Sequence, residues 1–347
     1  MNTFWEFLAA QYPASSISSK GYWRVTSKPS KAESDCHITA LSQYGFLAVE
    51  GPDSSKFLQG QTTCDWRKID IENASLGSYC NIKGRMVISF IAGMRDGESA
   101  LLRLRSDTAD TGCATLAKYI VFSKAKIRNA TNEYIAIGIS GKCAREQLQQ
   151  YFGFAPTAMM RQATDGETTL VQLDSDGECF ECWAPAASAN AIWTALSENA
   201  CAIDSCEWEA LNIAAGIGEI CADTQDMFIP QMLNHQLIGG VSFNKGCYTG
   251  QEIVARMQYR AKLKRRLYRG RLSASVNAMD YKPGADLFSG DEPQSIGNLV
   301  SAVTRGNDVE LLAVLTDDAV ATNQVHFAGE ATTLEILALP YSLPTAD

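Results

Sequence analysis

The sequence has no long hydrophobic run. Its longest apolar stretch, around residues 87–94, ends at Arg95 and Asp96 and is far shorter than the roughly 20 apolar residues of a membrane-spanning helix. The N-terminal segment lacks the basic region and long apolar core of a secretion signal, and its pattern predicts a short amphipathic helix instead. We therefore expect a cytoplasmic protein with no membrane partner.

Histidine is scarce, and the cysteines follow no metal-binding or disulfide pattern. Three histidines leave few partners for a zinc site, and eleven cysteines, an odd number, show no tight framework. Cys179 and Cys182 form a CxxC, but on the strand predicted there their side chains point to opposite faces and cannot share a metal. We predict no metal site, and we expect mostly reduced, buried cysteines. Phosphate-loop, dinucleotide, zinc-protease and nucleophile-elbow motifs are absent too.

The length and the order of predicted elements indicate an α+β protein of two or three domains. A chain of 347 residues exceeds what one compact core usually holds. Up to residue 265 strands and helices mix without regular βαβ alternation, whereas residues 266–347 show short β runs between turns and predict a β-barrel domain. The expected strands cover residues 45–50, 118–127, 134–139, 168–173, 178–183, 267–272, 295–304, 309–315 and 332–337, with a hairpin over 79–94 and helices over 142–152 and 186–199.

The motif KGCYTGQE at residues 245–252 carries the most specific chemical signal. Thr249 and Glu252, followed by apolar residues, have the spacing of a capping box, which would place Cys247 two residues before a helix N-cap. The helix N-terminus and the ammonium of Lys245 would both favour the thiolate. Gly246 and Gly250 have no side chains, so a ligand could approach the backbone closely at both positions. Two interpretations stay open, a reactive Cys247 assisted by Lys245 and an inert packing cysteine.

Positive charge is concentrated in one segment of an acidic chain. The net charge is −9, yet residues 256–271 contain no acid. Arg256, Arg260 and Lys264 would share one face of a helix that ran that far, so the segment is either an RNA contact or a solvated surface. We call it the basic stripe, and it comprises Arg256, Arg260, Lys262, Lys264, Arg265, Arg266, Arg269 and Arg271.

Several motifs together resemble the YgfZ family of folate-binding, tRNA-modification-linked proteins. The hallmark is the cysteine motif at 245–252 with the four residues after it, and the resemblance extends from about residue 38 to the C-terminus. More distantly, the arrangement is similar to the glycine-cleavage T-protein, a tetrahydrofolate-dependent aminomethyltransferase. The other matching segments lie at residues 51–61, 80–86, 118–124, 228–243 and 339–343.

The resemblance implies an aminomethyltransferase-like fold around a central folate channel, with two interleaved α+β subdomains over residues 1–265 and a C-terminal β-barrel. It implies tetrahydrofolate as the cofactor. It also implies support of iron–sulfur cluster assembly or repair, and through it of tRNA methylthiolation, together with a link to replication-initiator regulation. The expected partners are folate, iron–sulfur proteins such as a tRNA methylthiotransferase, and tRNA. The folate-binding residues that it implies are Tyr44, Trp208, Gln231, Gly246 and Gln251.

The chain departs from the family pattern at three places. Tyr44 stands where related sequences carry tryptophan, and Ala214 stands where the family often has a glutamate that can accept pterin hydrogen bonds. The aspartate of the T-protein falls near Ile88 and Ser89, where no carboxylate stands, so we do not expect aminomethyl transfer of the glycine-cleavage kind. The alternatives are a folate-dependent one-carbon transferase or demethylase on another substrate, and a tRNA-binding module that uses the basic stripe.

Overall fold

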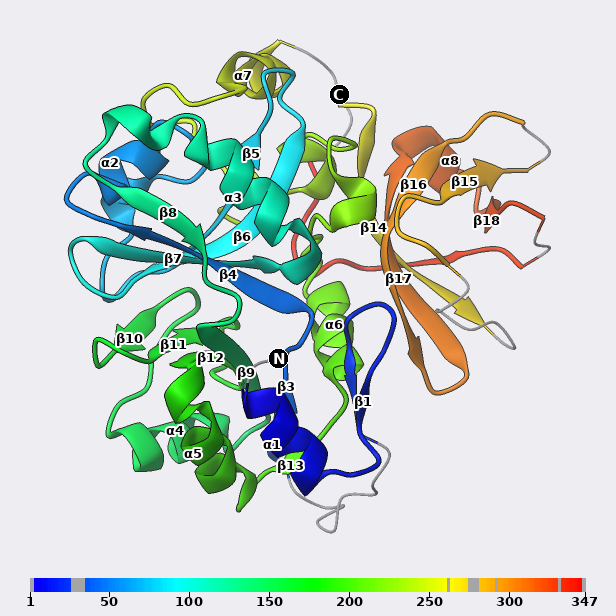
Figure 1. Cartoon of the computed structure of the whole chain (residues 1–347). Helices are drawn as coiled ribbons and strands as arrows, with labels where there is room; N and C mark the ends of the chain where they lie inside the picture. Colours follow the sequence, from blue (N-terminus) through cyan, green and yellow to red (C-terminus); the bar gives the residue numbers. More distant parts are fainter. Residues whose placement is uncertain are drawn as a thin grey trace. The chain divides into compact units, whose positions relative to one another are not determined.

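The computed structural model describes residues 3–25, 35–260, 263–273, 281–290, 293–329 and 332–344. The chain forms two compact units (Figure 1). Unit 1 comprises Met1–Gln61, Asp65–Leu76 and Phe90–Trp208, and unit 2 comprises Thr62–Cys64, Gly77–Ser89 and Glu209–Asp347. The mixture of helices and mainly antiparallel sheets confirms the predicted α+β class, while the boundary expected after residue 265 stays a prediction.

The first sheet of unit 1 has six strands in the order β10-β11-β12-β9-β3-β13. Its neighbours run antiparallel except β13 and β3, which are parallel. The strands predicted at 134–139, 168–173 and 178–183 are confirmed as β9, β11 and β12. The bounds are β3 His37–Ala40, β9 Tyr134–Ser140, β10 Gln162–Thr164, β11 Thr169–Gln172, β12 Cys179–Pro185 and β13 Cys201–Ala202.

Three helices pack with this sheet and with one another. They are α1 (Thr3–Gln11), α4 (Ala144–Phe152) and α5 (Ala186–Ser197), which confirms the helices expected at the N-terminus, at 142–152 and at 186–199 (Figure 1). In α1, Phe4 and Leu8 are four residues apart and lie on one face, and both are buried in the core. Trp193 on α5 meets Phe4 edge to face in the same cluster. A short pair of strands, β1 (Ser16–Ile17) and β2 (Trp23–Arg24), follows α1.

The second sheet has five strands in the order β5-β6-β7-β4-β8. The predicted hairpin at 79–94 is confirmed as β5 and β6, whose turn is closed by a hydrogen bond from the Asn81 N–H to the carbonyl oxygen of Arg85. The strand expected at 45–50 is confirmed as β4. The bounds are β4 Tyr44–Glu50, β5 Ser75–Cys80, β6 Met86–Met94, β7 Ser99–Arg105 and β8 Lys126–Asn129, with α2 Ser54–Gln59, α3 Ala109–Ala117 and the 3-10 turns η1 Trp66–Lys68 and η2 Ser106–Thr108.

The strand expected over 118–127 is wrong for most of its length. Residues Ile120–Phe122 form the 3-10 turn η3, and the strand β8 begins only at Lys126. The β-branched and aromatic residues favoured a strand, but backbone hydrogen bonds from Tyr119 to Leu116 and from Ser123 to Ile120 extend the turn that follows α3. The strand propensity of these residues was therefore overridden by hydrogen bonds that continue the helical turn after α3.

Unit 2 combines irregular segments with an all-β sheet at its C-terminal end. The sheet order is β18-β15-β16-β17-β14-β19, every neighbouring pair is antiparallel, and Leu287, Leu299 and Leu311 lie in its core. The sheet curls as a half-barrel, so among the described residues β18 and β19 are its two edges rather than partners in a closed barrel. The bounds are α6 Ser205–Ala214, η4 Ala222–Thr224, η5 Pro230–Leu233, α7 Gln251–Tyr259, β14 Arg265–Ser273, β15 Asp286–Ser289, β16 Gly297–Arg305, β17 Asp308–Thr316, α8 Asp317–Ala321, β18 Val325–Phe327 and β19 Glu335–Leu337.

In the part of the chain that the structure describes, no helix is both long enough and apolar enough to span a membrane.

Candidate functional site

The cysteine motif lies in unit 2 as a loop that leads into α7. Cys247 is exposed, and it is the one exposed thiol among the eleven cysteines, all of which lie in the described residues. Gly246 is exposed beside it, and a Cβ added there would meet nothing within 4 Å. The loop therefore presents its sulfur to solvent with open space on its N-terminal side.

The predicted capping box at Thr249 is wrong. The N-cap of α7 is Gly250, which has a left-handed φ of +82°, and no side chain caps it. A Cβ at Gly250 would lie 2.4 Å from the carbonyl oxygen of Asn81, so both its backbone conformation and the adjacent β5–β6 turn require glycine. Gln251 is then the first helical residue and is half-buried. Cys247 lies three residues before the N-cap, one residue further from the helix than expected.

Lys245 is buried and holds the loop in place. Its Nζ donates hydrogen bonds to the carbonyl oxygens of Thr62 at 2.5 Å and Cys64 at 2.8 Å, and it lies 5.0 Å from the ring centroid of Tyr248. Charge-assisted hydrogen bonds of this kind stabilise by about 1.5–3 kcal/mol each. The lysine therefore attaches the loop to the Thr62–Cys64 segment, and its electrostatic assistance to Cys247 stays a prediction.

Two buried groups lie beneath the loop. Burial raises the pKa of the Cys80 thiol to about 12, and burial also raises the pKa of the Tyr248 hydroxyl well above its usual range. At neutral pH both groups are protonated, so Cys80 is not a nucleophile despite its place in the family pattern. Of Cys80 and Cys247, only Cys247 is exposed, and its reactivity stays a prediction.

Labelling of the native protein with a thiol reagent at pH 8 is expected to modify Cys247 first and at one equivalent per chain. Burial raises the pKa of both half-buried thiols, Cys113 and Cys179, and slows their reaction. In urea without reductant, nine thiols should react. The control is Cys247→Ser, which should remove the rapid equivalent; a rapid phase that persists in this variant contradicts the assignment.

Gln231, a predicted folate contact, supports α7. Its Nε2 donates to the carbonyl oxygen of Val254 at 2.6 Å, while its Oε1 is buried and has no hydrogen-bond partner among the described residues. The same is true of Asn234 Oδ1, His235 Nδ1 and the Tyr248 hydroxyl. Buried polar atoms are usually paired, so these four atoms mark where water or a ligand can bond within unit 2.

The two aromatic residues implied by the resemblance are buried in unit 1. The guanidinium of Arg103 stacks on Tyr44 at 3.9 Å from its ring centroid. Trp208 is 0% exposed and its ring lies on Gly138, where an added Cβ would be 2.6 Å from the indole. Gly138 is thus required by the close approach of Trp208. Its cross-strand neighbour Thr39 meets the same position at 2.9 Å.

Three buried polar atoms at these aromatic residues have no hydrogen-bond partner in the described structure. They are Nε1 of Trp208 itself, Oγ1 of Thr39, which meets Gly138 as Trp208 does, and Oε1 of Gln43, which precedes Tyr44 in the sequence. A pterin offers a flat ring with an exocyclic amine, a carbonyl oxygen and ring nitrogens, which pair with such donors and acceptors. The residues of unit 1 therefore fit a pterin in chemical type, with orphaned groups on both Thr39 and Trp208.

Sequence reasoning missed a buried ion pair beside Tyr44. Arg103 Nε donates to Glu181 Oε2 at 3.0 Å, and Trp183 Nε1 donates to the same oxygen at 2.7 Å; the Arg103 and Glu181 side chains are 2% and 0% exposed. The available signal was a charged residue with apolar neighbours on each strand, Arg103 between two leucines on β7 and Glu181 between Phe180 and Cys182 on β12. Strand periodicity cannot show that two such residues meet.

The basic stripe does not form one surface. Helix α7 ends at Tyr259 with Arg260 as its C-cap, so the predicted helical face of Arg256, Arg260 and Lys264 is wrong beyond Arg260. Lys262 lies outside the described residues, and Arg265 donates to the carbonyl oxygen of Ser295. Three arginines of β14 are paired with acids, Arg266 with Asp317 at 3.2 Å, Arg269 with Glu310 at 2.6 Å and Arg271 with Glu335 at 2.6 Å.

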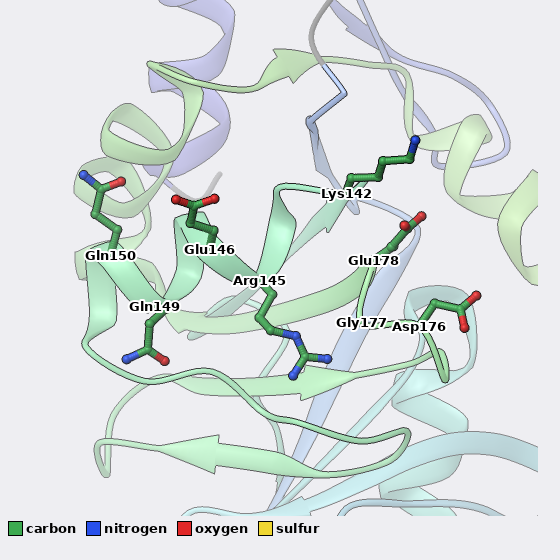
Figure 2. A pocket seen from close by; sticks show the side chains of 8 residues that line it. All are labelled: Lys142, Arg145, Glu146, Gln149, Gln150, Asp176, Gly177 and Glu178. Carbon is green, nitrogen blue, oxygen red and sulfur yellow. The ribbon is translucent and has the colours of Figure 1, made fainter.

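A pocket of about 630 Å³ lies elsewhere in unit 1, between α4 and the turn before β12 (Figure 2). Its wall carries Lys142, Glu146, Asp176 and Glu178, which are exposed, and Arg145, whose guanidinium donates to Pro156 and Gln172. None of the residues expected at the site lines it. Among the described residues, no group of three or more histidine, cysteine or acidic side chains is placed to hold a metal ion.

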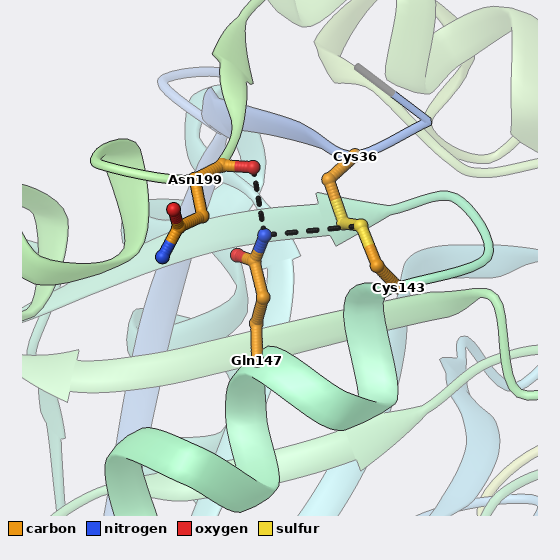
Figure 3. Close-up of a disulfide and its surroundings, with 4 residues drawn as sticks. All are labelled: Cys36, Cys143, Gln147 and Asn199. Atoms are coloured by element: carbon orange, nitrogen blue, oxygen red, sulfur yellow. Dashed lines mark hydrogen bonds between the residues drawn. A yellow bond between two sulfur atoms is a disulfide. The ribbon is translucent and has the colours of Figure 1, made fainter.

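Cys36 and Cys143 form a disulfide beside that pocket (Figure 3). Their Cα atoms are 5.7 Å apart and 107 residues separate them in the sequence. Gln147, one turn into α4, donates to Cys143 Sγ at 3.8 Å and to the carbonyl oxygen of Asn199 at 2.8 Å. The expectation of reduced cysteines therefore does not apply to this pair, whereas the other nine carry no disulfide.

The fold places the chain among aminomethyltransferase-like proteins. The glycine cleavage system aminomethyltransferase T from Bartonella henselae superposes with a TM-score of 0.66 at 17% identity, covering 88% of this chain and 86% of that chain. The model of the GCVT N-terminal domain family matches residues 5–214.

Two relatives narrow this class. The tRNA-modifying protein YgfZ of Klebsiella pneumoniae (strain 342) is 35% identical over 313 residues, which cover 89% of this chain and 94% of the relative. YgfZ of Serratia proteamaculans (strain 568) is 33% identical over 329 residues, covering 92% and 98%. The chain belongs to the YgfZ family.

Proposed function

We propose that this protein supports tRNA modification, as the names of its relatives state for them, and that it does so as a folate-binding factor with Cys247 as its functional thiol. The observation that carries the proposal is the exposed Cys247 in a loop that matches the family motif, in a chain that aligns with YgfZ over nine-tenths of its length. In the finer form of the proposal, the factor assists assembly or repair of iron–sulfur clusters in enzymes such as a tRNA methylthiotransferase.

The loop geometry supports a role in which the thiol acts on a partner rather than on a buried substrate. Cys247 is exposed while Lys245 and Tyr248 beneath it are buried, so the backbone that carries the sulfur is held from below. A thiolate is the form that ligates a metal or attacks an electrophile. Transient cluster ligation and formation of a thiol-linked intermediate both use this arrangement.

Tetrahydrofolate is the proposed cofactor. When bound, a reduced folate supplies or accepts a one-carbon unit. In unit 1, the orphaned Nε1–H of Trp208 and hydroxyl of Thr39 would bond the pterin, and Tyr44 would contribute an aromatic surface stiffened by Arg103. The proposed contacts of unit 2 are Gln231, Gly246 and Gln251. Because Ala214 offers no carboxylate, we expect weaker folate binding than in relatives with glutamate there.

One-carbon transfer as the main activity is the less supported alternative. At the position where the T-protein has its aspartate, Ser89 is buried and its Oγ accepts a hydrogen bond from the Ile220 N–H at 2.8 Å. The hydroxyl is thus occupied structurally and does not replace a proton-handling carboxylate.

Isothermal titration with tetrahydrofolate tests the cofactor. The unchanged protein should bind saturably, and Trp208→Phe should raise the Kd about tenfold, because it keeps the ring and removes the N–H that would bond the pterin. Trp193→Phe is the matched control, since Trp193 is also 0% exposed but lies in the core between α1 and α5. Absence of binding by the unchanged protein, or equal losses in both variants, would overturn the folate assignment.

A further inference from the structure

A second basic segment lies in unit 1, between α3 and β8. Residues 118–128 contain Lys118, Lys124, Lys126 and Arg128 and no acid, in a chain whose net charge is −9. Like the basic stripe, whose segment holds Tyr259 and Tyr268, this segment carries aromatic and aliphatic side chains between its cations. Charge and apolar surface are therefore combined within eleven residues.

The apolar side chains of this segment face solvent. Phe122 is 99% exposed, Val121 67% and Tyr119 47%, whereas Ile120 is buried and anchors the turn. The backbone hydrogen bond from Ser123 to the carbonyl oxygen of Ile120 closes η3 at 2.8 Å. A fully exposed phenylalanine loses hydrophobic stabilisation, and η3 presents it on an ordered turn rather than on a chain end.

The lysines around this turn are not neutralised. Lys118, Lys124 and Lys126 are exposed and have no ion pair among the described residues. Two neighbouring acids have other partners: Glu50, opposite Lys126 on β4, pairs with Arg95 and Arg128, and Asp53 accepts the backbone N–H of Lys124. The positive charge is therefore available to a partner.

We propose that this surface binds a single-stranded segment of RNA. It is named here the Phe122 surface, and it comprises Lys118, Tyr119, Val121, Phe122, Lys124 and Lys126. Exposed aromatic rings stack on unpaired bases, and neighbouring lysines neutralise the phosphates between them. The positive charge favours a polyanion, and the alternation of rings with cations favours one whose unpaired bases can stack on those rings. The proposal rests on the proposed role in tRNA modification, to which it adds a site of RNA contact.

The comparison with the basic stripe supports this choice. Arg269 and Arg271 pair with acids of the same sheet, and Arg266 pairs with Asp317 at the start of α8, which lowers the attraction of these arginines for phosphate. The Phe122 surface has fewer cations, but its three lysines remain unpaired and surround a ring with almost no internal contact. The sequence analysis named only the basic stripe as an RNA contact, and the pairing of its β14 arginines leads us to the Phe122 surface instead.

Fluorescence anisotropy of the full chain with a labelled short oligouridylate, and with an unmodified tRNA transcript, tests the proposal. Phe122→Ala should raise the Kd about tenfold, since one base–aromatic stack is lost. The triple variant Lys118→Ala, Lys124→Ala and Lys126→Ala should lower the slope of log K against log salt by about 2. Ile82→Ala, which removes an 80% exposed side chain of unit 2, and Arg271→Ala, which removes a paired cation, should bind as the unchanged protein does.

Three outcomes overturn the proposal. The first is RNA binding that neither Phe122→Ala nor the triple variant weakens, and the second is no RNA binding at all. The third is loss in Phe122→Ala of binding to phosphatidylglycerol vesicles or to an acidic polypeptide while RNA binding is retained. None of these affects the proposed function, which fails instead if cells carrying Cys247→Ala keep normal tRNA modification. The two ideas are therefore separable.

Discussion

Cys247→Ala is expected to reduce tRNA methylthiolation in cells to the level seen without the gene, and to leave the protein folded. The side chain is exposed, so the free energy of unfolding should change by less than about 0.5 kcal/mol. The functional loss follows because no other thiol can replace it: Cys80 is held protonated by a pKa of about 12 and is fully buried. The measurement is mass spectrometry of tRNA nucleosides from complemented deletion cells.

Cys113→Ala is the matched control, because Cys113 is a half-buried free cysteine of unit 1 outside the family motif. It should complement fully. Complementation by Cys247→Ala would show that the exposed sulfur is dispensable, and equal failure of both variants would point to a general loss of the protein rather than to the thiol.

Glu181→Ala is expected to have the largest effect on stability, a loss of about 3–5 kcal/mol in the free energy of unfolding. Removal of the carboxylate takes the Glu181 ion pair from the Arg103 guanidinium, which is 2% exposed, and frees the Trp183 N–H from its acceptor. It also releases the guanidinium that stacks on Tyr44. Urea unfolding followed by circular dichroism measures the change.

Glu133→Ala is the control, since Glu133 pairs with Arg128 at the surface, where both side chains are more than one-third exposed. An exposed pair of this kind should contribute less than about 1 kcal/mol. The double variant Arg103→Met with Glu181→Leu should recover most of the stability, because it removes both charges of the pair. Equal, small losses in Glu181→Ala and Glu133→Ala would mean that the buried pair is not structurally important.

Much of the fold was predictable because its elements have strong local periodicity. The alternation in β9, β11 and β12, the apolar faces of α4 and α5, and the hairpin around Gly84 were all readable in single segments. The strand predicted over 118–127 was wrong because β-branched and aromatic residues favour strands whose surface is half-buried, whereas Val121 and Phe122 are exposed to solvent. The sequence of a single segment does not show whether another part of the chain packs over it.

The candidate site was predictable only in part for a related reason. The motif around Cys247 identified the loop, and the structure adds that its sulfur is exposed. The helix start was misplaced by one residue, because the β5–β6 turn approaches Gly250 so closely that only glycine can stand there. Lys245 was expected beside the thiol, yet its ammonium bonds two carbonyls from a segment more than 180 residues away in the sequence.

The sequence by itself determined the α+β class, most element positions, the family and the cysteine loop, since each depends on residues that are close along the chain. Tertiary structure decided which charges are paired. It placed Asp317, Glu310 and Glu335 beside the arginines of β14, buried Arg103 with Glu181, and left the lysines around Phe122 open. The physical reason is that hydrophobic periodicity is a local property, whereas the partner of a charge and the burial of a side chain depend on segments brought together only by the fold.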